Sequence, residues 1–154
     1  MELKTKIAAE EGKQELTITR VFDLSVELLF RAYAEPEIVE QWMGTKVVKL
    51  DNKKHGGYIF ETTDPKGNKH VFSGAIHDFT PGKSIIRTFE MENTTFDAQL
   101  EFLEFEELTN ETSQLTIKIV YKSLAMRDQM LQLPFAQGIN MAHNTLQEVV
   151  SKLK

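Results

Sequence analysis

Arg87 is the residue whose type and position point most clearly to chemistry. It shares strand parity with Ile85 and Phe89, so the pleat of a strand places its side chain on an apolar face. A guanidinium on such a face needs a partner, because an unpaired buried charge is very costly. The partner is either the carboxylate or other oxyanion of a ligand, held by bidentate hydrogen bonds, or an internal glutamate. A bulge that turns Arg87 outward is the third alternative.

Mostly apolar side chains are expected to surround the same space as Arg87. Each of them taken alone is also explained by ordinary core packing. The hydroxyl groups of Tyr33, Tyr58 and Tyr121 are further candidates for binding a ligand, although a buried tyrosine equally needs a partner within the protein. Together with Arg87, the predicted ligand-binding cavity is lined by Trp42, Tyr58, Phe60, Phe72, Phe89, Leu100, Phe102, Met130, Phe135 and Ile139.

The four histidines do not form a convincing metal site. His70 and His77 are predicted on one strand but on opposite faces, His55 lies in a predicted turn, and His143 lies on the terminal helix. The chain has no cysteine, no Gly-x-Ser-x-Gly motif, no phosphate-binding glycine-rich loop and no dinucleotide fingerprint. We therefore expect no metal and no cofactor, and we assign no catalytic residue. Plentiful carboxylates leave general acid–base chemistry open.

The N-terminal part of the chain predicts one strand followed by two short helices. Alternating apolar residues predict a strand over residues 14–22. Ser25 is the predicted N-cap of a short amphipathic helix. Pro36 ends that helix and opens a second one, since proline suits the first position of a helix and disfavours helical geometry in the residue before it.

The rest of the chain predicts an antiparallel meander closed by a helix. Turn-bounded segments predict six more strands, over residues 46–50, 57–63, 70–79, 85–91, 96–102 and 115–121. Residues 124–131 suggest one helical piece, and Pro134 then restarts a longer helix. An apolar stripe on that helix can lie across the sheet, and it consists of Phe135, Ile139, Ala142, Leu146, Val149 and Leu153.

Composition sets limits on the class of protein. The chain has 154 residues, 41% of them hydrophobic, and 18 Lys plus Arg against 23 Asp plus Glu give a net charge of −5. This length suits a single domain over residues 1–154. The acidic balance argues against nucleic acid as a partner. No apolar stretch approaches the roughly 20 residues that cross a bilayer, and the charged N-terminus does not resemble a signal peptide. We therefore expect a cytoplasmic protein with no membrane partner.

Several stretches in a fixed order resemble a known family. They are Leu24 to Pro36 with Gln41-Trp42, Gly56-Gly57-Tyr58, Phe72-Ser73-Gly74-Ala75-Ile76 with the turn Thr80-Pro81-Gly82, Ile85-Ile86-Arg87-Thr88-Phe89, and Pro134 to Met141. The chain resembles the activator of heat-shock-protein-90 ATPase homologue family, within the START-like, Bet v-like helix-grip superfamily that also holds polyketide cyclases. It departs from the pattern at Phe89, where members often carry tryptophan, and at Pro134. Both departures could alter the shape of the pocket.

The resemblance implies a fold and three functions. The implied fold is α+β, a helix grip in which a curved antiparallel sheet of about six or seven strands carries two short helices and a long C-terminal helix. The first function is binding of a small hydrophobic or amphipathic molecule in a cavity between the sheet and that helix. The others are interaction with a chaperone partner as an ATPase activator, and a cyclase-like enzyme activity. We expect a binding protein rather than an enzyme, and leave homodimer formation open.

Overall fold

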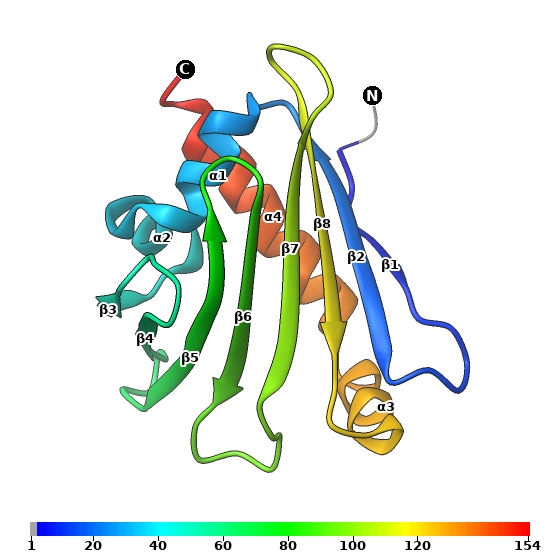
Figure 1. The fold of residues 1–154 in the computed structure, drawn as a ribbon. Coiled ribbons are helices and arrows are strands. Elements are labelled where there is room, and N and C mark those ends of the chain that lie inside the picture. The colour runs from blue at the N-terminus through cyan, green and yellow to red at the C-terminus, as the bar shows by residue number, and fades with distance from the viewer. Residues whose placement is uncertain (1–2) are drawn as a thin grey trace.

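An open antiparallel sheet forms the frame of the molecule in the computed structural model, which describes residues 3–154 (Figure 1). Met1 and Glu2, the first two residues of the predicted domain, lie outside the described residues. Neighbouring strands follow the order β1-β2-β8-β7-β6-β5-β4-β3. The strands are β1 (Lys6–Ala8), β2 (Glu15–Phe22), β3 (Lys46–Leu50), β4 (Gly57–Thr63), β5 (Lys69–Thr80), β6 (Ser84–Met91), β7 (Gln99–Glu107) and β8 (Ser113–Val120).

Four helices accompany the sheet within the described residues. They are α1 (Val26–Ala34), α2 (Pro36–Met43), α3 (Leu124–Gln132) and α4 (Phe135–Ser151). The predicted signals at the first two helices are confirmed, since the Ser25 side chain accepts a hydrogen bond from the Leu28 N–H and Pro36 is the first residue of α2. Gly44 ends α2 with φ of 61°, a left-handed conformation that favours glycine.

The α+β class and the antiparallel sheet are confirmed, but the strand count of six or seven is wrong. The sheet has eight strands, and the additional one is β1. It has three residues and pairs with β2 through Lys6 and Thr19. Three residues are too few for a period of two to be recognised in sequence, so only the pairing with β2 identifies β1 as a strand.

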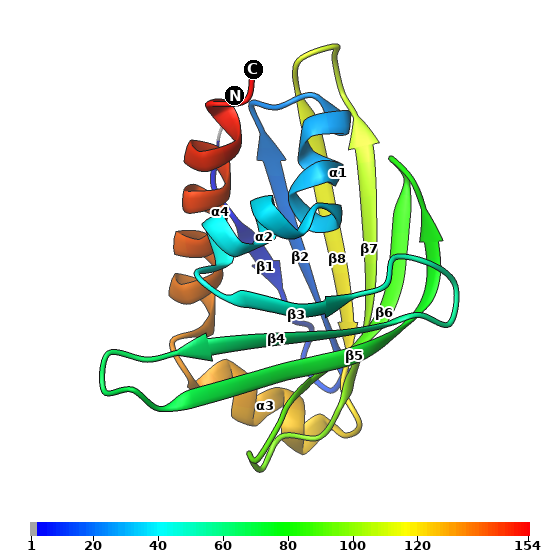
Figure 2. The ribbon, with the colours of Figure 1, turned by 90° about the vertical axis from the view of Figure 1, so that its left-hand side faces the viewer.

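The sheet curves strongly, and all the long covering elements lie on one side of it. In Figure 2, β3, β4 and β5 lie across the view whereas β2, β8 and β7 lie close to vertical, and α4 lies on the open side of the curve. We call the side that faces α1, α2 and α4 the inner face, and the opposite side the outer face. Alternation is strict on β2, where every second residue from Leu16 to Phe22 is buried against the inner side.

The apolar interior consists of two clusters. The main cluster joins β2, β7, β8, α1 and α4, and it includes Leu103, Ile117 and Leu146. A smaller cluster, here called the β4–β5 cluster, contains Val39, Tyr58, Phe60 and Ile76. Phe79 packs against both. The inner face therefore carries two apolar clusters. The polar residues described next lie between them.

Candidate functional site

An ion pair between Arg87 and Glu101 lies on the inner face of the sheet. The two residues face each other across β6 and β7, and the Arg87 Nε donates to Glu101 Oε1 at 3.2 Å. Only 12% of the Arg87 side chain and 10% of the Glu101 side chain are exposed. The other carboxylate oxygen of Glu101 accepts a hydrogen bond from Gln99 Nε2 at 2.8 Å. Of the three alternatives for Arg87, the structure therefore shows the internal glutamate.

The ring of Tyr58 also contacts the guanidinium of Arg87. The Arg87 Cζ lies 5.1 Å from the centre of the Tyr58 ring, a distance typical of a cation–π contact. The Tyr58 hydroxyl donates to the backbone carbonyl of Thr88, so this hydroxyl is already satisfied by the protein. Tyr58 belongs to the β4–β5 cluster, whereas Glu101 is next but one to Leu103 of the main cluster. We call the three residues Tyr58, Arg87 and Glu101 the seam.

The surroundings of Arg87 keep its guanidinium charged and leave its two terminal nitrogens without a hydrogen bond to the described residues. Burial opposes the charge, but the neighbouring Tyr58, Glu101 and Tyr33 outweigh burial and raise the pKa of Arg87. Within residues 3–154 the guanidinium forms its hydrogen bond through Nε, and its two terminal nitrogens donate to no described residue. Those two nitrogens are not among the fully enclosed atoms without a partner, so part of their surface is accessible to solvent.

Two further buried tyrosines, Tyr33 and Tyr121, feel the charge of Glu101. Tyr121 follows β8 and is 2% exposed, and its hydroxyl is enclosed without a hydrogen-bond partner in the described part of the chain. Burial raises the pKa of Tyr121, and the charge of Glu101 raises it further. Burial likewise raises the pKa of Tyr33, which α1 places near both charges. Both hydroxyl groups are therefore neutral donors at ordinary pH.

Most residues of the predicted cavity do come to the inner side. Phe72 and Phe89 stack with ring centres 5.6 Å apart, beside Tyr58 and Phe60 in and around the β4–β5 cluster. Trp42 is buried at the other side, where its indole N–H donates to the Ala32 carbonyl. Residues that line the main cluster from α3 and α4 are Met130, Phe135 and Ile139.

Leu100 and Phe102 lie on the outer face, which corrects their predicted place beside Arg87. In β7 the inward residues are Gln99, Glu101 and Leu103, so the two intervening residues point the other way. Leu100 is 36% exposed. Phe102 pairs with Lys118 across β7 and β8, among outward residues. This strand carries polar residues at two inward positions and apolar residues at two outward positions. The hydrophobic pattern therefore predicted the wrong face for Leu100 and Phe102.

Glu101 and Gln99 are the site residues that sequence reasoning missed. Both sit in a segment with many acidic residues, which is typical of a solvated surface. The useful signal was parity with Leu103 and Phe105, which are fully or nearly buried. A glutamate on the same face as these residues, opposite an arginine on the same face of the next strand, indicates an internal ion pair.

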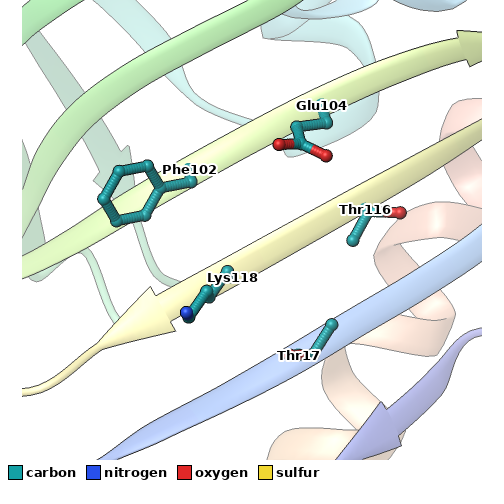
Figure 3. A pocket seen from close by; sticks show the side chains of 5 residues that line it. All are labelled: Thr17, Phe102, Glu104, Thr116 and Lys118. Atoms are coloured by element: carbon teal, nitrogen blue, oxygen red, sulfur yellow. The ribbon is translucent and has the colours of Figure 1, made fainter.

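Clear hollows are found on the outer face. One, of about 340 Å³, is lined by Phe102 with Glu104 and Lys118 on its polar sides, and Figure 3 shows these side chains over β7 and β8. A larger hollow of about 600 Å³ lies over β5, β6 and β7. It is lined by His55, Ala75, Ile76, His77, Ile86, Arg87, Thr88, Leu100 and Phe102. Phe102 thus lines both of these outer hollows and does not line the interior between the sheet and α4.

A second buried polar group lies under α4, at Arg20. Arg20 is 2% exposed and donates to Asn144 Oδ1 at 2.9 Å and to Thr5 Oγ1 at 3.3 Å. None of the ion pairs found among residues 3–154 includes it. His143 lies beside it, with Nδ1 2.8 Å from Thr5 Oγ1 and its ring edge-on to Phe22. These polar contacts connect α4 with β2 and with Thr5, the residue that precedes β1.

Lowering the pH is expected to destabilise the fold through His143. Burial, with a smaller effect of the Arg20 charge, lowers the pKa of His143 from 6.5 to about 4. The unfolded chain therefore binds the proton more readily, and the contribution to stability is complete above about pH 6.5 and is lost toward about pH 4. The loss should be roughly 3 kcal/mol. Urea unfolding at several pH values, compared with His143→Gln, measures it. Parallel curves for the two proteins would show that His143 is not responsible.

Residues 3–154 contain neither a cluster of metal-binding side chains nor a helix suited to a membrane. No group of three or more histidine, aspartate or glutamate side chains is arranged to hold a metal ion there. No helix among these residues is both long enough and apolar enough to span a bilayer.

Comparison with known proteins identifies a family and a fold. The family model described as "Activator of Hsp90 ATPase homolog 1-like protein" matches residues 23–151. No curated protein matches the sequence. Protein Ms6760 from Mycobacterium smegmatis is 23% identical, with a TM-score of 0.80 over 95% of this chain and 96% of that one. A protein from Rhodobacter sphaeroides is 18% identical, with a TM-score of 0.87 over 97% and 99%. These two likenesses show the fold alone.

Proposed function

The chain belongs to the family of Activator of Hsp90 ATPase homolog 1-like proteins, and we propose that it binds a small hydrophobic or amphipathic molecule between its sheet and α4. The observation that carries this proposal is the seam. It places hydrogen-bonding groups between two apolar clusters, on the inner face of a curved sheet. A few polar groups in apolar surroundings are the usual composition of a small-molecule site.

The cover of the interior is uneven along α4, which supports entry at one end. Leu146 and Val150 in the C-terminal half of α4 are fully buried. Phe135 and Ile139 in the N-terminal half are only half-buried against the main cluster. A ligand entering beside α3 and the start of α4 would complete the burial of these side chains. Such burial of apolar surface is the main source of affinity for a greasy ligand.

Titration calorimetry with methyl decanoate, decanol and decanoate tests the proposal. At least one of these ten-carbon probes should bind with a stoichiometry near one and raise the melting temperature. Ile139→Trp fills the expected entrance and should abolish binding. Leu100→Trp makes a similar change on the outer face and should leave binding intact. Absence of saturable binding by all three probes would reject the proposal, as would loss of binding in Leu100→Trp with retention in Ile139→Trp.

The chaperone partner and the cyclase-like activity stay predictions from the resemblance. The family description refers to activation of the Hsp90 ATPase, and it is the observation that favours the first of them. Measuring the ATPase rate of the chaperone with an excess of this protein tests it directly. A dose-dependent increase would support that second function. An unchanged rate at high excess would reject it.

A further inference from the structure

We propose, on the basis of the ligand-binding function above, that the interior site prefers an uncharged amphiphile whose head group accepts a hydrogen bond, such as an ester or an alcohol, over the matching carboxylate. Two observations point there. The positive charge of the seam is already paired within the protein, and the enclosed hydroxyl of Tyr121, a residue of the main cluster, has no partner among residues 3–154.

The first observation concerns charge. Arg87 and Glu101 together carry no net charge, and Gln99 occupies the second oxygen of the carboxylate. A carboxylate ligand would bring a second negative charge close to Glu101 in surroundings that screen charges poorly. It would also lose its hydration without gaining a free counter-ion. A neutral head group avoids both penalties, and it can still accept from the terminal nitrogens of Arg87.

The second observation concerns the direction of the hydrogen bond. Tyr121 is 2% exposed, and its enclosed hydroxyl has no partner in the described chain. Glu101 lies near enough to influence its titration, yet it accepts from Arg87 and Gln99 and not from Tyr121. Burial of an unpaired hydroxyl is unfavourable, and an arriving acceptor relieves it. Tyr58 offers no such group, since its hydroxyl already donates to Thr88.

Affinities of methyl decanoate and decanoate at neutral pH test this preference. The two probes share one acyl chain and differ in charge. Methyl decanoate should bind at least about tenfold more tightly, because the site has no uncompensated cation for the carboxylate. Tyr121→Phe should weaken methyl decanoate about five- to tenfold while leaving the free protein as stable as before, since no hydrogen bond within the protein is lost.

Glu101→Gln removes the negative charge beside Arg87 with little change in the shape of the side chain. It leaves the charge of Arg87 without its carboxylate, so decanoate should gain about tenfold relative to methyl decanoate. If this variant does not fold, Tyr121→Phe alone decides. Tighter binding of decanoate to the wild-type protein, or an unchanged affinity of methyl decanoate in Tyr121→Phe, would overturn the preference while leaving the proposed function standing. Failure of every probe to bind would instead reject the proposed function itself.

Discussion

Arg87→Met is expected to lower the free energy of unfolding by about 3–5 kcal/mol. The substitution leaves Glu101, whose side chain is 10% exposed, as an unpaired carboxylate on the inner face. The contact of the guanidinium with the Tyr58 ring is lost as well. Equilibrium unfolding in urea measures the change, and the slope against urea concentration shows whether the native state stays compact.

The double variant Arg87→Met/Glu101→Leu tests whether the loss of stability comes from the unpaired carboxylate of Glu101. Replacing both charges by apolar side chains removes the unpaired carboxylate, so most of the lost stability should return. The matched control is Lys118→Met, which breaks an ion pair with Glu15 whose side chains are 48% and 40% exposed, and it should change stability by less than about 1 kcal/mol. If Arg87→Met is no more harmful than Lys118→Met, the ion pair is not in a dry interior.

Gly74→Ala is expected to destabilise the protein by roughly 4 kcal/mol. A Cβ at this position would lie 2.0 Å from the backbone oxygen of Thr88 and 2.7 Å from the Tyr58 hydroxyl. The first neighbour belongs to the backbone of the adjacent strand and cannot rotate away as a side chain can. The clash therefore lowers the free energy of unfolding by the full cost of overpacking. The hydrogen bond from Tyr58 to Thr88 is then displaced, which adds about 1 kcal/mol. Urea unfolding provides the measurement.

Gly138→Ala is the control for this substitution. Gly138 lies in α4, and a Cβ there meets nothing within 4 Å. Alanine is the better helix former, so this variant should be more stable by about 0.5–1 kcal/mol. A small effect of Gly74→Ala, similar in size to that of Gly138→Ala, would contradict the close approach of β4, β5 and β6 beside the seam.

Local signals in the sequence were sufficient for the helices and for the face of Arg87. Ser25 and Pro36 act through the backbone within one turn, so their effect does not depend on the rest of the fold. Arg87 shares its face with Ile85, which is buried, and strand geometry fixes that relation. Periodicity and turn signals likewise predicted the order of the elements, and this order was part of the resemblance to the family.

Pairing between distant residues could not be predicted in the same way. The partner of Arg87 comes from β7, where Glu101 occurs among other acidic residues. The same strand carries Leu100 and Phe102 outward, so its apolar residues gave the wrong parity. Strand β1 is held by β2 and has almost no pattern of its own. In each case the decisive interaction joins residues that are far apart in sequence.

Chemical-shift mapping by NMR with methyl decanoate tests most directly whether the ligand enters between the sheet and α4. We predict that titration shifts the signals of residues that lie on the inner face and do not line the outer hollow, namely Phe89, Tyr121 and Ile139. The outer residues His77, Ile86, Leu100 and Phe102, which line the hollow of about 600 Å³, should stay unchanged. Shifts confined to this outer set, with the inner signals unmoved, would contradict binding at the seam.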